Sequence, residues 1–169
     1  MGNLSNRKKI EDLINFRIAE EEKSSRLYLA MAKWLKFQGY EGAATLWQKY
    51  SNEDLVHAQK AYTYLEDLDI KPKVPALSEP KCEFKSLAEI CKLSDSHEDL
   101  ITSQCSDLAK ASISESDFMT LALAQWYLTE QVEEKSKTTY WLNRIDILGG
   151  ESITTTNLYL LDKEMSKKA

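Results

Sequence analysis

Residues 69–85 read DIKPKVPALSEPKCEFK and contain all three prolines of the chain. This stretch lies between two segments that each show a pair of long helical patterns. It is too long for a tight turn between neighbouring helices, but it can carry the chain from one end of a helical bundle to the other. Two helical hairpins joined by one long crossover describe a four-helix bundle. A cytokine-type bundle is the alternative, but it needs two long crossovers and only one is visible.

The few chain breakers set the expected helix bounds. Gly39 ends the first helix, and Gly149 with Gly150 ends the fourth. Ser86 and Glu89 form a capping box at the start of the third helix, and Ser114 or Ser116 is the expected cap of the fourth. The sequence therefore predicts one all-α domain over residues 1–169, with four long helices and a short fifth over about 6–37, 41–68, 86–111, 116–148 and 156–165.

The composition excludes several classes of protein. The chain has 169 residues, 43% of them hydrophobic, and a net charge of −5, so a basic surface for nucleic acid is not expected. Three scattered cysteines without a CxxC pair indicate reduced thiols and a cytoplasmic protein. The polar start MGNLSNRKKIEDL predicts no signal peptide, and no apolar run is long enough to span a membrane.

Each predicted long helix has an inward stripe that repeats in steps of three and four residues. The ends of each stripe are largely apolar or aromatic, and its middle carries an acid. Those acids are Glu21, Asp54, Glu98 and Glu134, one from each helix. His57 in the second helix and Gln131 in the fourth lie on the same stripes.

Four carboxylates that converge in a core repel each other and are costly to bury. A pair of metal ions would satisfy them, and acids on opposed helices with an acid-x-x-His pair are known as a di-iron site in a bundle. Mostly oxygen ligands with one imidazole suit iron or manganese better than structural zinc.

The alternative is that some of these acids lie on solvated faces, because a shift of one residue in register would place them there. The EEEK run at 20–23 is expected to be mostly solvated, with only Glu21 on the stripe. His97 falls off the stripe, so we expect it at the surface or beside the site rather than as a ligand.

The sequence resembles bacterial non-haem ferritin over about residues 10–165, which implies a ferritin-like four-helix bundle. No single stretch is decisive, but their order and spacing together are specific. The matching stretches are SSRLYLAMAKW at 24–34, YEGAATLWQ at 40–48, NEDLVHAQ at 52–59, SHEDLIT at 96–102, QWYLTEQVEE at 125–134 and LYLLDKEM at 158–165.

The resemblance implies three iron positions. The first matches Glu21, Asp54 and His57. The second shares Asp54 and adds Glu98 and Glu134, with Gln131 as a hydrogen-bonding neighbour. A third, looser site on the cavity side matches the four acids of the flanks, and Tyr28 matches a tyrosine beside the first site that hydrogen-bonds or donates an electron. The acids of the third site are Glu53, Glu130, Glu133 and Glu134.

Some positions separate this chain from relatives or from the family pattern. Gln131 and Glu134 stand where bacterioferritin-like and rubrerythrin-like proteins carry a second Glu-x-x-His, and the second predicted helix has no methionine for haem. The family has Glu at the bridging position, where this chain has the shorter Asp54. Three outcomes stay open: the helix moves inward, Asp54 binds through one oxygen, or Glu53 shares the bridging role.

The resemblance implies ferroxidase activity and iron storage in the cytoplasm. Two Fe(II) ions would be oxidised by dioxygen or peroxide, and Fe(III) would be stored as mineral inside a homo-oligomer of twenty-four subunits. The short fifth helix would line a four-fold axis with leucines that a monomer would expose. The alternatives are a di-iron oxidase that removes peroxide and stores little iron, and a structural bundle without catalytic metal.

Overall fold

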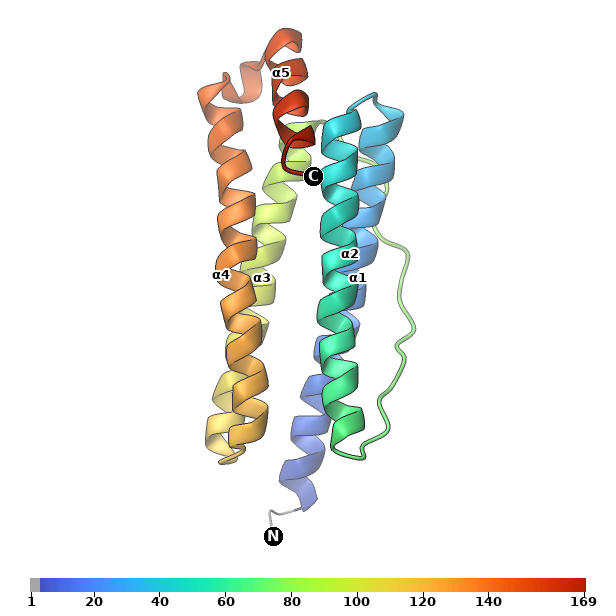
Figure 1. Ribbon diagram of the computed structural model, residues 1–169, viewed down its shortest axis with the longest axis vertical. Coiled ribbons are helices and arrows are strands. Elements are labelled where there is room, and N and C mark those ends of the chain that lie inside the picture. The colour runs from blue at the N-terminus through green and yellow to red at the C-terminus, as the bar shows by residue number, and fades with distance from the viewer. Residues whose placement is uncertain (1–3) are drawn as a thin grey trace.

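The computed structural model describes residues 4–169, with side chains described for residues 8–150 and 152–169. The expected start of the domain at residues 1–3 lies outside this part. Four long helices stand side by side, and a short fifth helix lies across one end (Figure 1). Their bounds are α1 Leu4–Phe37, α2 Glu41–Asp67, α3 Leu87–Ser114, α4 Phe118–Ile147, the 3-10 turn η1 Gly150–Ser152 and α5 Thr155–Ser166. Residues 4–169 contain no strand, so the predicted all-α bundle is confirmed.

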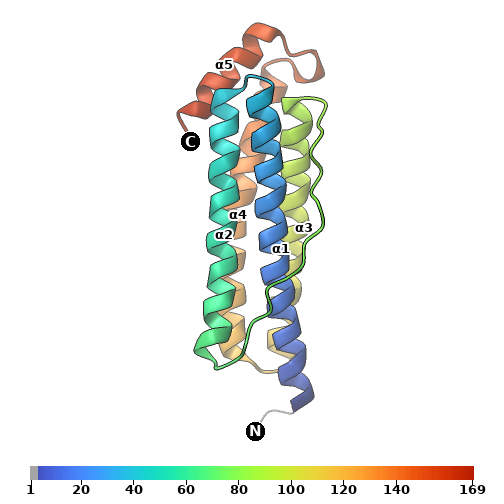
Figure 2. The same cartoon turned by 90° about the vertical axis from the view of Figure 1, so that its right-hand side faces the viewer.

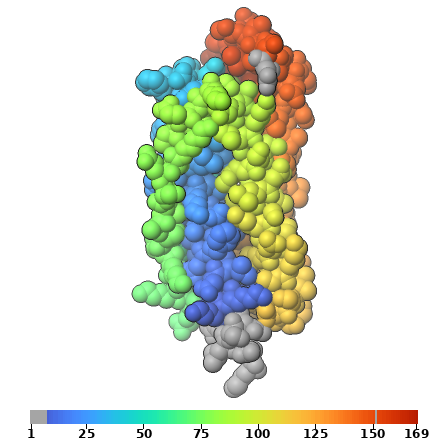
Figure 3. Space-filling model, turned by 180° about the vertical axis from the view of Figure 1, so that it is seen from behind, coloured from blue at the N-terminus to red at the C-terminus, as the bar shows by residue number. Residues whose placement is uncertain are grey.

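The long crossover has the predicted position. It leaves the end of α2 and runs along the bundle beside α1 before it enters α3 (Figure 2), and it forms a strip along one edge of the molecule with α1 visible beside it (Figure 3). The side-chain oxygen of Asn15 accepts a hydrogen bond of 2.8 Å from the Lys73 amide, and the Phe84 ring packs against Trp34. Because α1 and α2, and likewise α3 and α4, are joined by short loops, the cytokine-type alternative is excluded.

The helix ends differ from the prediction in two places. Ser86 caps α3 as expected, but Glu89 accepts a hydrogen bond from the Lys85 amide instead of the Ser86 amide. The predicted cap of α4 was wrong, because Asp117 accepts from the Thr120 amide at 3.0 Å and caps the helix. The cause is the length of α3, which continues through Ser114 and leaves a short turn before α4.

Helix α5 docks on the start of α2. Its Asp162 accepts a hydrogen bond of 2.8 Å from the Ala43 amide, which satisfies one of the free amides at that helix start. A Cβ at Gly42 would lie 2.0 Å from the Asp162 carbonyl oxygen, so this contact requires glycine. Leu161 and Met165 are fully buried here. The expectation that a monomer would expose the leucines of this helix was therefore wrong for Leu161, because α5 packs back onto its own bundle.

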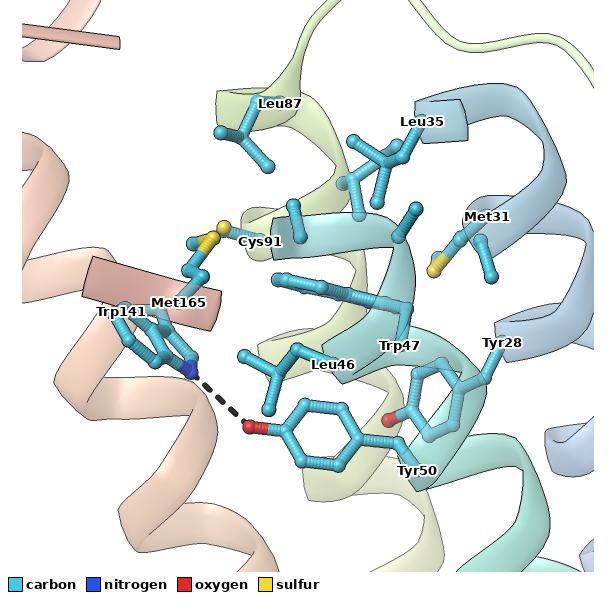
Figure 4. Packing of buried hydrophobic residues seen from close by; sticks show 14 of the residues in the cluster. Tyr28, Met31, Leu35, Leu46, Trp47, Tyr50, Leu87, Cys91, Trp141 and Met165 are labelled. Atoms are coloured by element: carbon cyan, nitrogen blue, oxygen red, sulfur yellow. Dashed lines mark hydrogen bonds between the residues drawn. The ribbon is translucent and has the colours of Figure 1, made fainter. Parts of the chain in front are cut away.

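The core consists of two apolar clusters, one toward each end of the bundle. The cluster near α5 includes Trp47 and Trp141. The ring nitrogen of Trp141 donates a hydrogen bond of 3.1 Å to the Tyr50 hydroxyl (Figure 4). The other cluster includes Ile18 and Leu65. On each long helix the predicted acid falls between residues of these clusters, so the acids share one level of the bundle. No helix within residues 4–169 is long and apolar enough to cross a membrane.

Candidate metal centre

Glu21 from α1 and Asp54 and His57 from α2 form a compact buried group. One ligand atom of each lies within 4.8 Å of the others. His57 Nδ1 is 3.7 Å from both Glu21 Oε2 and Asp54 Oδ1. In the part of the chain that the structure describes, no other group of three such side chains has this spacing. The two helices thus place the predicted first set of ligands around one point.

Two oxygen atoms in this group have unmet bonding capacity. Glu21 Oε1 and Asp54 Oδ2 are buried and accept no hydrogen bond. A buried carboxylate oxygen without a donor is destabilising, whereas a cation between the two acids would satisfy it. Two carboxylates and one imidazole are a ligand set that suits iron or manganese, so these residues fit a divalent metal ion.

Arg17 lies behind the group and is itself 2% exposed. Its Nε is 3.0 Å from Glu21 Oε1, but the N–H does not point at that oxygen, and neither atom makes a hydrogen bond. Arg17 Nη1 instead donates to Gln104 at 3.0 Å, and the guanidinium faces the Tyr127 ring. Arg17 therefore supplies positive charge without occupying the space between the acids.

The electrostatics of the group also favour a cation. Burial raises the pKa of Asp54 well above its usual value, and the neighbouring charges of Glu21, Glu98 and Glu134 raise it further. Burial lowers the pKa of His57, but the carboxylates of Glu21, Glu134 and Glu130 together outweigh this effect, and the net pKa is raised. These shifts have one physical cause, because several acids share a space with little water.

Glu98 lies close enough to contribute to the raised pKa of Asp54 and is held by two donors. The Tyr28 hydroxyl donates to its Oε1, and Gln131 Nε2 donates to its Oε2 at 3.0 Å. Burial raises the pKa of Tyr28 well above its usual value, as does Glu98 itself, so the phenol remains a donor. Tyr28 and Gln131 thus orient Glu98, because each donates to a different oxygen of its carboxylate.

Of two further residues near the centre, His97 lies in one of its two expected places and Glu20 does not lie where it was expected. His97 lies beside the site and not at the surface, since its Nε2 is 2.7 Å from Ser24 Oγ and its ring packs edge-on against Tyr28. The expectation that Glu20 is solvated was wrong. It is 7% exposed and accepts a hydrogen bond of 2.9 Å from Gln104, because α3 packs over that side of α1.

Three of the four acids predicted for the third site surround a lysine. Lys137 Nζ lies 3.0 Å from Glu134 Oε1, 3.1 Å from Glu133 Oε1 and 3.2 Å from Glu53 Oε2. Glu130 differs, because its Oε2 faces His57 Nε2 at 3.7 Å. The sequence prediction missed Lys137, although a lysine three residues after Glu134 and four after Glu133 lies on the same helix face.

Lys137 and Glu134 also change each other's protonation. Burial raises the pKa of Glu134 to about 7 although the Lys137 ammonium lowers it. Burial alone would lower the pKa of Lys137, but Glu134, Glu53 and Glu133 together outweigh burial and raise that pKa. The ammonium is therefore charged, and it places a positive charge at the edge of the acidic level.

The four-helix bundle and its buried Glu, Asp and His group define the ferritin-like class of proteins. The comparison of sequences agrees with this class. The family model described as "Ferritin-like domain" matches residues 11–148, so the chain belongs to the ferritin family. A probable bacterial non-heme ferritin-like protein of Haemophilus influenzae is 33% identical over 153 residues, which are 90% of this chain and 91% of that protein.

Two further relatives agree in sequence and in structure. The bacterial non-heme ferritin of Escherichia coli is 31% identical over 90% of this chain and 91% of its own length. The open pore ferritin from the hyperthermophilic archaeon Archaeoglobus fulgidus superposes with a TM-score of 0.90 at 29% identity and covers 94% of this chain and 96% of its own. The predicted resemblance to bacterial non-haem ferritin is confirmed.

Proposed function

We propose that this protein binds Fe(II), oxidises it with dioxygen or peroxide, and stores the Fe(III) as mineral. The observation that carries the proposal is the buried Glu21, Asp54 and His57 group, whose carboxylate oxygens Glu21 Oε1 and Asp54 Oδ2 lack a donor. Family membership supports it, because the matched relatives are named ferritins.

In this proposal the two iron positions share Asp54. Glu21 and His57 complete the first, and Glu98 and Glu134 complete the second, with Gln131 and Tyr28 holding Glu98 in place. Each Fe(II) gives up one electron, so two ions supply the two electrons that, with two protons, convert dioxygen to hydrogen peroxide. Hard carboxylate oxygens stabilise Fe(III) more than Fe(II), which favours the forward reaction.

Asp54 remains the proposed bridging acid. Its Oδ1 lies 3.7 Å from His57 Nδ1, and its Oδ2 is buried and accepts no hydrogen bond, so Oδ2 is available to bind a second ion. Glu53 points to Lys137 at 3.2 Å and would have to leave that ion pair before it could share the bridging role. This geometry favours Asp54 over its neighbour.

The storage step requires a shell, and we propose a homo-oligomer of twenty-four subunits in the cytoplasm. Several large apolar side chains are exposed on the outer faces of the helices, which supports burial against further copies. They include Leu55, Val56, Leu100, Val132 and Leu160, each more than half exposed. A small assembly that consumes peroxide and retains little iron would instead indicate the di-iron oxidase.

The proposal is tested by removing one ligand from each iron position. We expect His57→Ala and Glu134→Ala each to slow aerobic Fe(II) oxidation by about 100-fold, because loss even of a residue that only supports a ligand costs about 10- to 100-fold. The rate is measured by the ultraviolet absorbance of Fe(III), and circular dichroism checks that helix content is kept. Glu66→Ala, an exposed acid on α2, is the matched control and should oxidise iron normally. Wild-type rates in both ligand variants would contradict the proposed site.

A further inference from the structure

The ammonium of Lys137 is placed as a metal ion would be. Three carboxylates approach it at 3.0 to 3.2 Å, and an ammonium has three N–H donors. The Tyr50 ring covers it from another side, with 5.8 Å between Nζ and the ring centre. The lysine side chain is 24% exposed, so the arrangement is partly shielded from water.

A divalent ion cannot join this cluster while the ammonium stays in place. Both would occupy the space between Glu53, Glu133 and Glu134, and two positive charges at such short range repel each other strongly in a partly buried site. Charge-assisted hydrogen bonds also retain the lysine, and these are about twice as strong as neutral ones.

We propose that Lys137 is the resident cation of this outer group, so that a metal ion binds there only after the lysine leaves. This inference rests on the proposed function, because it concerns the path of iron beyond the two oxidation positions. We call the ligands of the two proposed oxidation positions the inner group, namely Glu21, Asp54, His57, Glu98 and Glu134. The expected stoichiometry is then two ions per subunit at metal concentrations that fill the inner group. A third ion would need a higher concentration.

The lysine has space into which it can move. A surface pocket of 290 Å³ adjoins it and is lined in part by Tyr50, Trp141 and Ser136. Lys137 itself lies in the wall of this pocket, and a rotation of its long side chain would bring the ammonium toward solvent. Displacement by a metal ion is therefore a competition between two cations and not an absolute block.

Lys135 provides a matched control on the same helix. Its ammonium pairs with Asp95 at 2.7 Å and with Asp99 at 2.8 Å, both on α3. It therefore carries the same charge on the same helix but contacts none of the three outer acids at ion-pair distance. Removal of this lysine changes the net charge equally without opening the outer position.

The experiment compares zinc binding in crystals of the assembled wild-type protein and of Lys137→Gln, Lys137→Met and Lys135→Gln. Zn(II) is redox-inert, so occupancy at each position is read from anomalous scattering across a series of zinc concentrations, independently of any oxidation. Methionine is included because a glutamine side chain could itself bind an ion. Thermal unfolding of each protein confirms that it is folded.

We expect both Lys137 variants to fill the outer position at about tenfold lower zinc than wild type and Lys135→Gln, a difference of about 1.4 kcal/mol. Equal occupancy of that position in all four proteins, whether full or empty, would overturn the role of Lys137. The inner group is read in the same crystals. An inner group that stays empty in every protein would contradict the proposed function, while the outer position would still decide the role of the lysine.

Discussion

The inner acids Glu21 and Asp54 come from α1 and α2, and the outer acids Glu53, Glu133 and Glu134 come from α2 and α4. The two groups meet at α2 but are satisfied differently. The outer group holds Lys137, which contacts each of its three acids. The inner group has Arg17 only at its back, and one oxygen each of Glu21 and Asp54 remains without a donor. The number of acids alone therefore does not identify a metal position. The inner group is marked by buried oxygens that accept no hydrogen bond, whereas the acids of the outer group are paired with a lysine of the same chain.

The largest predicted effect comes from removing the positive charge behind the inner group. Arg17→Met should lower the free energy of unfolding of the metal-free protein by about 3 kcal/mol, because breaking a buried ion pair leaves the other charge uncompensated. Zn(II) should restore part of this loss, so zinc should raise the melting temperature more in the variant than in wild type. Arg26→Met, an exposed arginine on the same helix, should change neither quantity. An equal zinc shift in both variants would contradict the charge role of Arg17.

A smaller effect is expected from pH, through Glu134 at the border of the two groups. Its pKa is about 7 in the folded protein against 4.5 as the ordinary value, so the folded state binds more protons between these values. The free energy of unfolding must then fall as the pH rises through this window. The pKa values of Asp54 and His57 are also raised, so both groups likewise lower the free energy of unfolding as the pH rises. Charged groups that act on Glu134 are Lys137, Glu98 and Glu53.

The measurement is urea unfolding in the presence of a chelator, at fixed protein concentration, between pH 5 and pH 7.5. Wild type should lose about 2 kcal/mol more than Glu134→Gln over this range, since one pKa unit corresponds to about 1.4 kcal/mol. Carboxylates with lowered pKa values, such as Glu20 and Asp95, lose their contribution only at lower pH. Parallel pH dependences in the two proteins would show that Glu134 is not perturbed by its surroundings.

The smallest effect is expected at Tyr28, which positions Glu98. Tyr28→Phe removes the donor to Glu98 Oε1 but leaves Gln131 in place, so we expect Fe(II) oxidation to slow by about tenfold, at the lower end for residues that support ligands. The control is Tyr50→Phe, because the Tyr50 hydroxyl accepts a hydrogen bond from Trp141 and does not donate to Glu98. Stopped-flow absorbance gives both rates. Equal rates of Fe(II) oxidation in Tyr28→Phe and Tyr50→Phe would contradict the positioning role of Tyr28.

Much of the fold was predictable because periodicity reports which side chains are buried. The predicted stripe of α3, from Leu87 through Glu98 to Leu108, is buried throughout. The stripe of α2 is less complete, because Tyr64 and Leu68 near its end are only partly buried. The cap at Asp117 was missed because the end of α3 could not be fixed to within one turn from propensity alone.

The candidate site was predictable as a set of residues but not as a set of contacts. Helical spacing placed Glu21, Asp54 and His57 on facing stripes, and the structure brings them together. The partners of the outer acids depend on which rotamers a lysine and three glutamates adopt, and spacing alone does not decide this. Glu20 was assigned to the solvated face because its burial depends on contact with Gln104 of α3, which is distant in sequence but packs against α1.

The most direct test of the central claim is the position of iron in the protein. Crystals of the assembled wild type would be soaked anaerobically in Fe(II), and the ions located by anomalous scattering at the iron edge. The account predicts a peak bound by Glu21, Asp54 and His57, and no peak in the space held by Lys137 when the inner position first fills. An empty inner position at saturating Fe(II), or a first peak among Glu53, Glu133 and Glu134, would contradict it.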